Sequence, residues 1–147
     1  MKAEEIDDDT KLSEIKVIDD LRKKIEINNE AYDHDPNTNS NPPCSVIVAY
    51  VNGEKFKSGK IGYAYDTNSM PYVVLIPEAA GSGALAHEIG HVLNYTNSTG
   101  NKDDAEPDPT QPSHNVNPGN LMYHIGGDKI SDVQCKKFRE STIILRP

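Results

Sequence analysis

The sequence predicts an α+β fold, in which a small twisted mixed β-sheet packs on an N-terminal helix and a central helix, with a further helix at the C-terminus. Three observations support this class. Apolar residues recur at steps of three and four over 11–29, β-branched runs of strand length occur at 45–51 and 72–76, and an amphipathic helix pattern covers 84–93. At 147 residues and without an internal repeat, the chain is predicted to be one domain, 1–147.

The composition argues against two classes of function. The formal net charge is −8, and the basic runs Arg22–Lys24 and Lys136–Lys137 are short. Nucleic-acid binding is therefore disfavoured, because it requires a basic surface. No apolar stretch approaches the length that crosses a bilayer, so a membrane-spanning segment is not expected.

The N-terminal third is predicted to hold one helix. Its apolar positions are Leu12, Ile15, Ile18, Leu21 and Ile25, and the acidic residues before it suit a helix N-terminus. Residues 1–10 are expected to fray. Residues 1–40 would thus form a helix and a linker, which could also serve as a short pro-segment. The linker contains His34, interpreted as a surface histidine.

Three strands are predicted next. The first, 45–51, ends at Asn52-Gly53, the second covers 61–65, and the third, 72–76, lies between Pro71 and Pro77. Flanking prolines favour an edge position for the third strand. Such an edge could bind an extended peptide, although a plain sheet edge is an equally good interpretation.

The helix over 84–93 carries the motif H-E-x-x-H. His87 and His91 lie four residues apart and therefore point to the same side, where they can hold one metal ion. Glu88 lies about 100° round the axis, within reach of a water on that metal. The apolar side chains gather on the opposite face and are expected to pack in the core: Leu85, Ile89, Val92 and Leu93.

Residues 94–120 are polar and contain four prolines, which exclude a long helix. A loop of this length requires an anchor. The last helix begins near Ser131, because Ser131-x-x-Gln134 has the form of a capping box, and Val133, Phe138 and Cys135 are expected to face the core. Cys44 and Cys135 could form one disulfide or remain two thiols, and two cysteines are too few to decide.

The motif at 87–94 and the segment Asn120-Leu-Met-Tyr123 together resemble the metzincin zinc peptidases. Their pattern is H-E-x-x-H-x-x-G-x-x-H followed by a methionine turn. Further likeness lies in Gly62-x-Ala-Tyr65 and in the start of the last helix, so that the resemblance covers about residues 45–140. It implies a metallopeptidase core at 41–147, with Met122 as a hydrophobic floor under the metal.

The sequence departs from this pattern twice. Asn94 stands at the glycine position, and Asn97, whose amide is a weak zinc ligand, stands at the third histidine position. His114 is the favoured third ligand, because it lies eight residues before Met122, as in matrixin-type metzincins. The alternative third ligands are the acidic residues of the loop: Asp103, Asp104, Glu106 and Asp108. If they do not bind zinc, these residues form a solvated segment or a structural Ca²⁺ site.

The predicted function is that of a zinc-dependent endopeptidase. One catalytic Zn²⁺ would be held by His87, His91 and His114, with Glu88 as general base and a peptide or protein as substrate. Tyr123 could line the substrate cleft or pack as a half-buried tyrosine, and an exposed surface position is expected for His124. The protein is expected to be a monomer, secreted or otherwise extracytoplasmic, with a cytoplasmic location left open.

Two alternatives remain at this point. A degenerate site would make the chain a non-catalytic zinc-binding domain that binds extended peptides. A gluzincin-like peptidase would instead use Glu106 as its third ligand, although the prolines around that residue argue against the helix on which gluzincins carry it. Zinc content without cleavage of unfolded protein would favour the first alternative.

Overall fold

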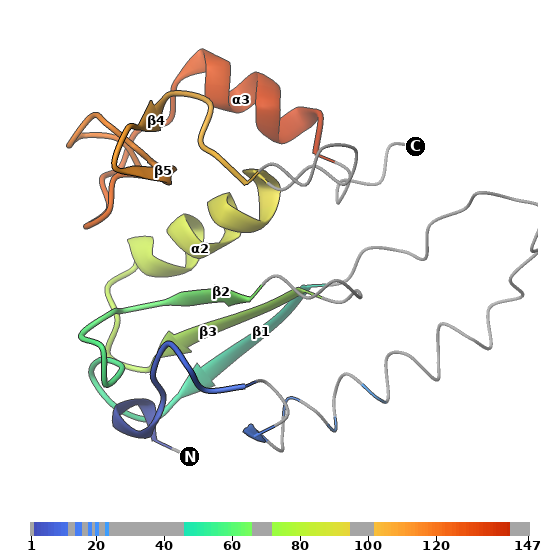
Figure 1. The fold of residues 1–147 in the computed structure, drawn as a ribbon, viewed down its shortest axis with the longest axis vertical. Coiled ribbons are helices and arrows are strands. Elements are labelled where there is room, and N and C mark those ends of the chain that lie inside the picture. The colour runs from blue at the N-terminus through green and yellow to red at the C-terminus, as the bar shows by residue number, and fades with distance from the viewer. Residues whose placement is uncertain are drawn as a thin grey trace, which may run out of the picture. The chain divides into compact units, whose positions relative to one another are not determined.

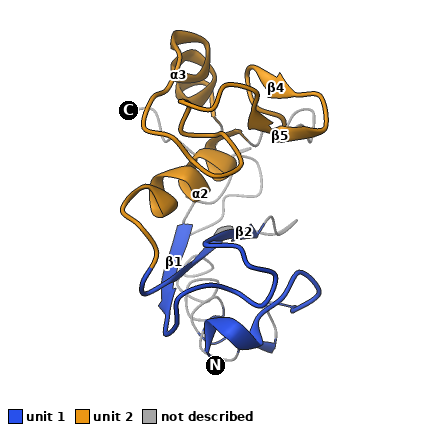
Figure 2. Ribbon diagram, turned by 90° about the vertical axis from the view of Figure 1, so that its left-hand side faces the viewer, with its two compact units in different colours: residues 1–79 blue, residues 80–147 orange. Residues whose placement is uncertain are grey.

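A computed structural model describes residues 2–11, 46–65, 72–94 and 102–141, together with Glu14, Ile15, Ile18, Asp20 and Lys23. The chain divides into two compact units, Met1–Ala79 and Ala80–Pro147 (Figure 2). The elements are a mixed three-stranded sheet, a two-stranded sheet and two α-helices, which confirms the predicted α+β class. None of the described helices has the length and apolarity needed to cross a membrane.

The sheet of the first unit has the order β1-β3-β2 (Figure 1). Strand β1 (Val46–Val51) runs parallel to β3 (Tyr72–Pro77), and β2 (Tyr63–Tyr65) pairs with β3 in the antiparallel sense. The prediction that the third strand is an edge strand was therefore wrong. Its prolines only bound the strand, and its run of buried apolar residues is typical of a central strand covered on both faces.

The core of the first unit joins the sheet to the N-terminal segment. Ile15 and Ile18 are buried, and Ile18 has helical conformation; most of the predicted helix at 11–29 lies outside the described residues. The expectation that residues 1–10 fray was wrong, because η1 (Ala3–Glu5) and the residue after it pack into this core. The cluster consists of Ala3, Ile6, Ile15, Ile18, Ile47, Phe56, Val73 and Leu75.

The second unit contains helix α2 (Gly83–Asn94), strands β4 (Pro107–Asp108) and β5 (Gln111–Asn115), and helix α3 (Asp132–Arg139) (Figure 1). The β4–β5 hairpin lies inside the segment predicted to be an irregular loop. Its turn forms because Oδ1 of Asp108 accepts hydrogen bonds from the backbone N–H of Thr110, the hydroxyl of Thr110 and the backbone N–H of Gln111.

Helix α3 begins at the predicted capping box, in which Ser131 and Gln134 exchange backbone-to-side-chain hydrogen bonds. Its inward face carries Gln134 and Phe138, four residues apart, whereas Val133 is 54% exposed, so that the prediction of a core position for Val133 was wrong. Cys135 is a free, half-buried thiol; Cys44 lies outside the described residues, as does His34.

Candidate metal centre

Three histidines of the second unit converge on one point. His87 and His91 come from adjacent turns of α2, and His114 comes from β5. One ring nitrogen from each lies within 4.8 Å of the others, and the described residues hold no other group of His, Cys, Asp or Glu that meets this condition. The ring centroids are separated by 4.7 Å (His87–His91), 5.4 Å (His87–His114) and 4.9 Å (His91–His114).

The spacing of the two helix nitrogens matches what a small divalent metal requires. Nε2 of His87 and Nε2 of His91 lie 3.1 Å apart. In a tetrahedral zinc site with Zn–N bonds of about 2.0–2.1 Å, neighbouring nitrogens lie about 3.3 Å apart. Three imidazoles are also a donor set that zinc accepts, with a fourth position left for water or substrate. The residues present therefore fit a metal ion.

Two of the histidines have hydrogen-bond partners at Nδ1, and the partner of His87 directs its lone pair toward the common point. Nδ1 of His87 lies 2.6 Å from the carbonyl oxygen of Leu121, which can only accept, so Nδ1 carries the proton and Nε2 presents its lone pair. Nδ1 of His114 lies 3.4 Å from the hydroxyl oxygen of Ser113, which is a longer contact. Backbone and hydroxyl partners of this kind orient imidazole ligands in metal sites.

Burial keeps these imidazoles neutral at physiological pH. It lowers the pKa of His91 to about 3, with smaller contributions from the neighbouring His87 and His114. Burial also lowers the pKa of His87 and of His114 from the ordinary histidine value. Because a metal binds the neutral ring, it does not have to displace protons from these nitrogens at pH 7.

Met122 lies against the turn of α2 that carries the two histidines. Its side chain is completely buried, and a β-carbon placed on Gly90 would lie 2.2 Å from its sulfur. Met122 therefore packs on the backbone of Gly90, the residue before His91. The motif H-E-x-x-H gives no reason for glycine at position 90, so sequence reasoning missed this contact.

The methionine turn is bonded both to β5 and to itself. The backbone N–H of Asn115 donates to the carbonyl of Met122 over 2.8 Å, and the N–H of Met122 donates to Oδ1 of Asn120 over 2.8 Å. The residue after His114 is thus held against the turn whose Leu121 carbonyl orients His87. The bond from Asn115 to Met122 and the bond from His87 to Leu121 therefore connect the third histidine to the helix histidines.

We expect Gly90→Ala to weaken this arrangement. Alanine is the better helix former by roughly 1 kcal/mol, but here its methyl group overlaps the sulfur of Met122, and overpacking of a core typically costs about 1–3 kcal/mol. Thermal unfolding of the metal-free protein should occur at a lower temperature, and zinc affinity should fall.

The matched control for this prediction is Gly83→Ala, also in α2, where an added β-carbon would meet no atom within 4 Å. That variant should be neutral or slightly stabilising. Equal unfolding temperatures for the two variants would contradict the proposed contact between Gly90 and Met122.

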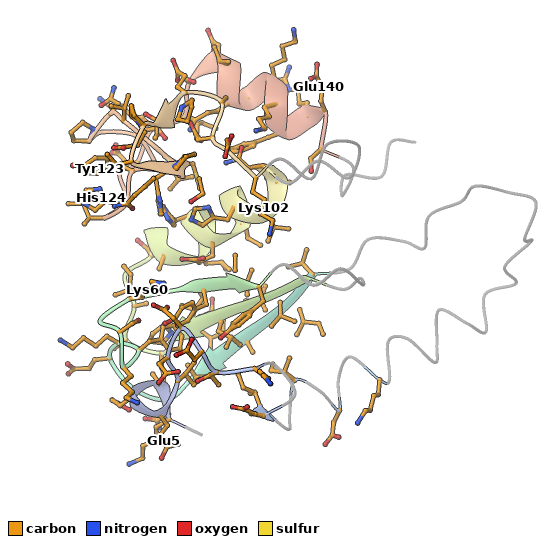
Figure 3. All side chains as sticks on the ribbon, viewed as in Figure 1. Glu5, Lys60, Lys102, Tyr123, His124 and Glu140 are labelled. Atoms are coloured by element: carbon orange, nitrogen blue, oxygen red, sulfur yellow. The ribbon has the colours of Figure 1, made fainter. Side chains whose placement is uncertain are left out.

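The remaining predicted site residues occupy different environments. Glu88 is buried on α2 beside His87. Tyr123 is half-buried, and its ring centroid lies 4.2 Å from that of the exposed His124 (Figure 3). Asn97 lies outside the described residues.

The acidic alternatives for the third ligand are not part of the histidine group. Asp103 and Glu106 are exposed, and Asp108 accepts the hydrogen bonds of the hairpin turn. Asp104 is buried among side-chain amides. His114, eight residues before Met122, is therefore the loop residue that lies with His87 and His91.

The fold and the site define a small α+β protein with a group of three histidines that could hold a metal ion. No known protein family, curated protein or solved structure matches the chain.

Proposed function

We propose that this protein is a zinc-dependent endopeptidase. The observation that carries the proposal is the convergence of His114 on His87 and His91, in a chain whose α2 also places Glu88 beside the first histidine. Two histidines four residues apart with an adjacent glutamate are the pattern of zinc peptidases, and the third histidine supplies the donor that the helix lacks. A peptide or protein substrate follows from this chemistry.

Each residue of the site has a separate role in the proposed reaction. His87, His91 and His114 would hold Zn²⁺, which when bound supplies a Lewis acid for a water molecule and for the substrate carbonyl. Glu88 accepts a proton on its carboxylate as the water adds to the carbonyl carbon, and passes that proton to the nitrogen of the leaving amine as the C–N bond breaks. Met122, buried under α2, holds the helix turn in place without donating to the metal.

Tyr123 follows Met122 directly and is half-buried. In this proposal its hydroxyl is a candidate donor to the carbonyl oxygen of the substrate, where negative charge develops during attack. The exposed His124 takes no part in binding the metal.

Removal of the metal tests the proposal as a whole. The purified protein should contain one zinc ion per chain and cleave an unfolded substrate such as casein. Dialysis against a chelator should abolish cleavage, and one equivalent of zinc should restore it, because the histidines alone cannot activate water. Cleavage that persists in the fully metal-free protein, or zinc-loaded protein that cleaves no unfolded substrate, would overturn the peptidase assignment.

A further inference from the structure

A buried carboxylate lies beside the histidine group and is not used by the proposed reaction. Asp104 is 3% exposed and accepts hydrogen bonds from three buried side-chain amides, those of Asn94, Asn115 and Gln134. A fourth buried amide, that of Asn120, is bonded to Gln134. We call these five side chains the amide network. They come from the end of α2, the loop before β4, the end of β5, the methionine turn and α3.

Four N–H donors converge on the Asp104 carboxylate. Oδ1 accepts from Nδ2 of Asn115 over 2.7 Å and from the backbone N–H of Glu106 over 2.9 Å. Oδ2 accepts from Nε2 of Gln134 over 2.7 Å and from Nδ2 of Asn94 over 3.4 Å. Among the described residues no ion pair involves Asp104. Burying a charge without a cationic partner is costly unless hydrogen bonds compensate, and bonds to a charged acceptor are the strong ones.

Members of the amide network lie close in sequence to His91 and His114 and to the carbonyl that orients His87. Asn115 follows His114 directly, and Asn94 lies three residues beyond His91 at the end of α2. Asn120 is bonded to Gln134 in both directions, over 2.7 Å and 2.9 Å, and precedes the Leu121 carbonyl that orients His87.

Asp104 also holds β5 on both sides of the third histidine. Its backbone N–H donates to the carbonyl of Pro112 over 2.7 Å, two residues before His114, and its carboxylate binds Asn115, one residue after it. Nineteen residues lie between Asn94 and His114. Fixing a ligand at the end of such a segment costs conformational entropy, unless other contacts have already closed the loop.

We propose that Asp104 is the positioning residue of the metal centre, which holds His114 in place for the metal through the amide network. The proposal rests on the histidine group binding a metal, as the proposed function requires. It assigns to Asp104 no contact with substrate or metal. It predicts that changes in the network alter the coordination of the metal and not only the stability of the fold.

The direct test is Asp104→Asn. The substitution keeps the size of the side chain but replaces one acceptor oxygen with a donor, which then faces a donor of Gln134 or of Asn115. We expect zinc affinity to fall about 10- to 100-fold, the usual effect of losing a partner that orients a ligand. In the cobalt-substituted protein the visible absorption, which reports ligand number and geometry, should change as His114 moves away.

Asp103→Asn is the matched control, because it makes the same chemical change at an exposed neighbouring position. It should leave zinc affinity and the cobalt spectrum unchanged. If Asp104→Asn fails to fold, Gln134→Met provides the second variant, since it removes a donor to Asp104 from α3, distant in sequence from all three histidines. It should shift affinity and spectrum in the same direction.

A double-mutant comparison shows whether Asp104 acts through His114. In the His114→Ala background, Asp104→Asn should lower zinc affinity by less than about threefold, because residues that share one effect are not additive. An equal loss in both backgrounds would overturn the proposal, and so would lower stability with unchanged affinity and spectrum. Wild-type protein that binds no metal would overturn this proposal and the proposed function together. Metal-binding protein without peptidase activity would overturn the function alone, and the Asp104 comparison would still be decided.

Discussion

Replacing Glu88 with glutamine is expected to abolish nearly all peptide cleavage while leaving the bound zinc in place. Glutamine has the same shape as glutamate but cannot accept the proton from the attacking water, and general base catalysis typically contributes about 10²- to 10⁴-fold to a rate. The three histidines are unchanged in this variant, so the metal should remain. Casein cleavage and zinc content, measured on the same preparation, test both parts.

Glu106→Gln is the matched control for Glu88→Gln. It makes the same substitution at an exposed position in the same unit, and it removes the carboxylate that a gluzincin-like site would use as third ligand. Cleavage and zinc content should both stay at the wild-type level. Full activity in Glu88→Gln would refute its role as general base, and loss of zinc from Glu106→Gln would transfer the third ligand to that carboxylate.

The second large effect is expected from His114→Ala. Removing one of three imidazole donors should lower zinc affinity by more than about 100-fold, since loss of an orienting partner alone typically costs 10- to 100-fold. Cleavage should fall in parallel at limiting zinc. Competition with a chelator of known zinc affinity gives the size of the effect.

Two controls accompany His114→Ala. His124→Ala removes an exposed histidine outside the three-histidine group, and Asn97→Ala removes the residue at the position where metzincins carry their third histidine. Neither should change zinc affinity. The opposite ranking, with Asn97→Ala losing zinc and His114→Ala retaining it, would move the third ligand to Asn97.

A local pattern predicted the helix of the site, and the resemblance to metzincins predicted its third histidine. Four-residue spacing places His87 and His91 on one side of any helix, so this pair required no tertiary information. The choice of His114 rested on the resemblance to matrixin-type metzincins, in which the third histidine lies eight residues before the turn methionine. The structure brings His114 to the helix pair.

The strand arrangement shows where local signals conflict. Pro71 and Pro77 favoured an edge position for the third strand, whereas the apolar run 73–76 between them is typical of a central one. β3 is the central strand, and the apolar residues 73–76 are all buried. Pro77 is the last residue of β3, so the pairing of the preceding residues with β1 is intact. The β4–β5 hairpin was missed since its strands are short, contain prolines and show no alternation.

The amide network could not be predicted from one sequence. Asp103 and Asp104 are adjacent and chemically identical, yet one is exposed and the other buried. That difference is set by contacts with Asn115 and Gln134, which are 11 and 30 residues away. The capping box predicted the hydrogen bond between the Gln134 side chain and the backbone of Ser131. It did not predict the bond that Gln134 donates to Asp104. The contact of Gly90 with Met122 likewise joins segments 32 residues apart.

The most direct test of the metal centre is a crystal structure of the zinc-loaded protein with anomalous data collected on both sides of the zinc absorption edge. We expect one zinc peak in the second unit, about 2.0–2.1 Å from one ring nitrogen each of His87, His91 and His114. A zinc peak bound by His87 and His91 with any third protein ligand other than His114, or no peak at these residues in zinc-saturated crystals, would contradict this account.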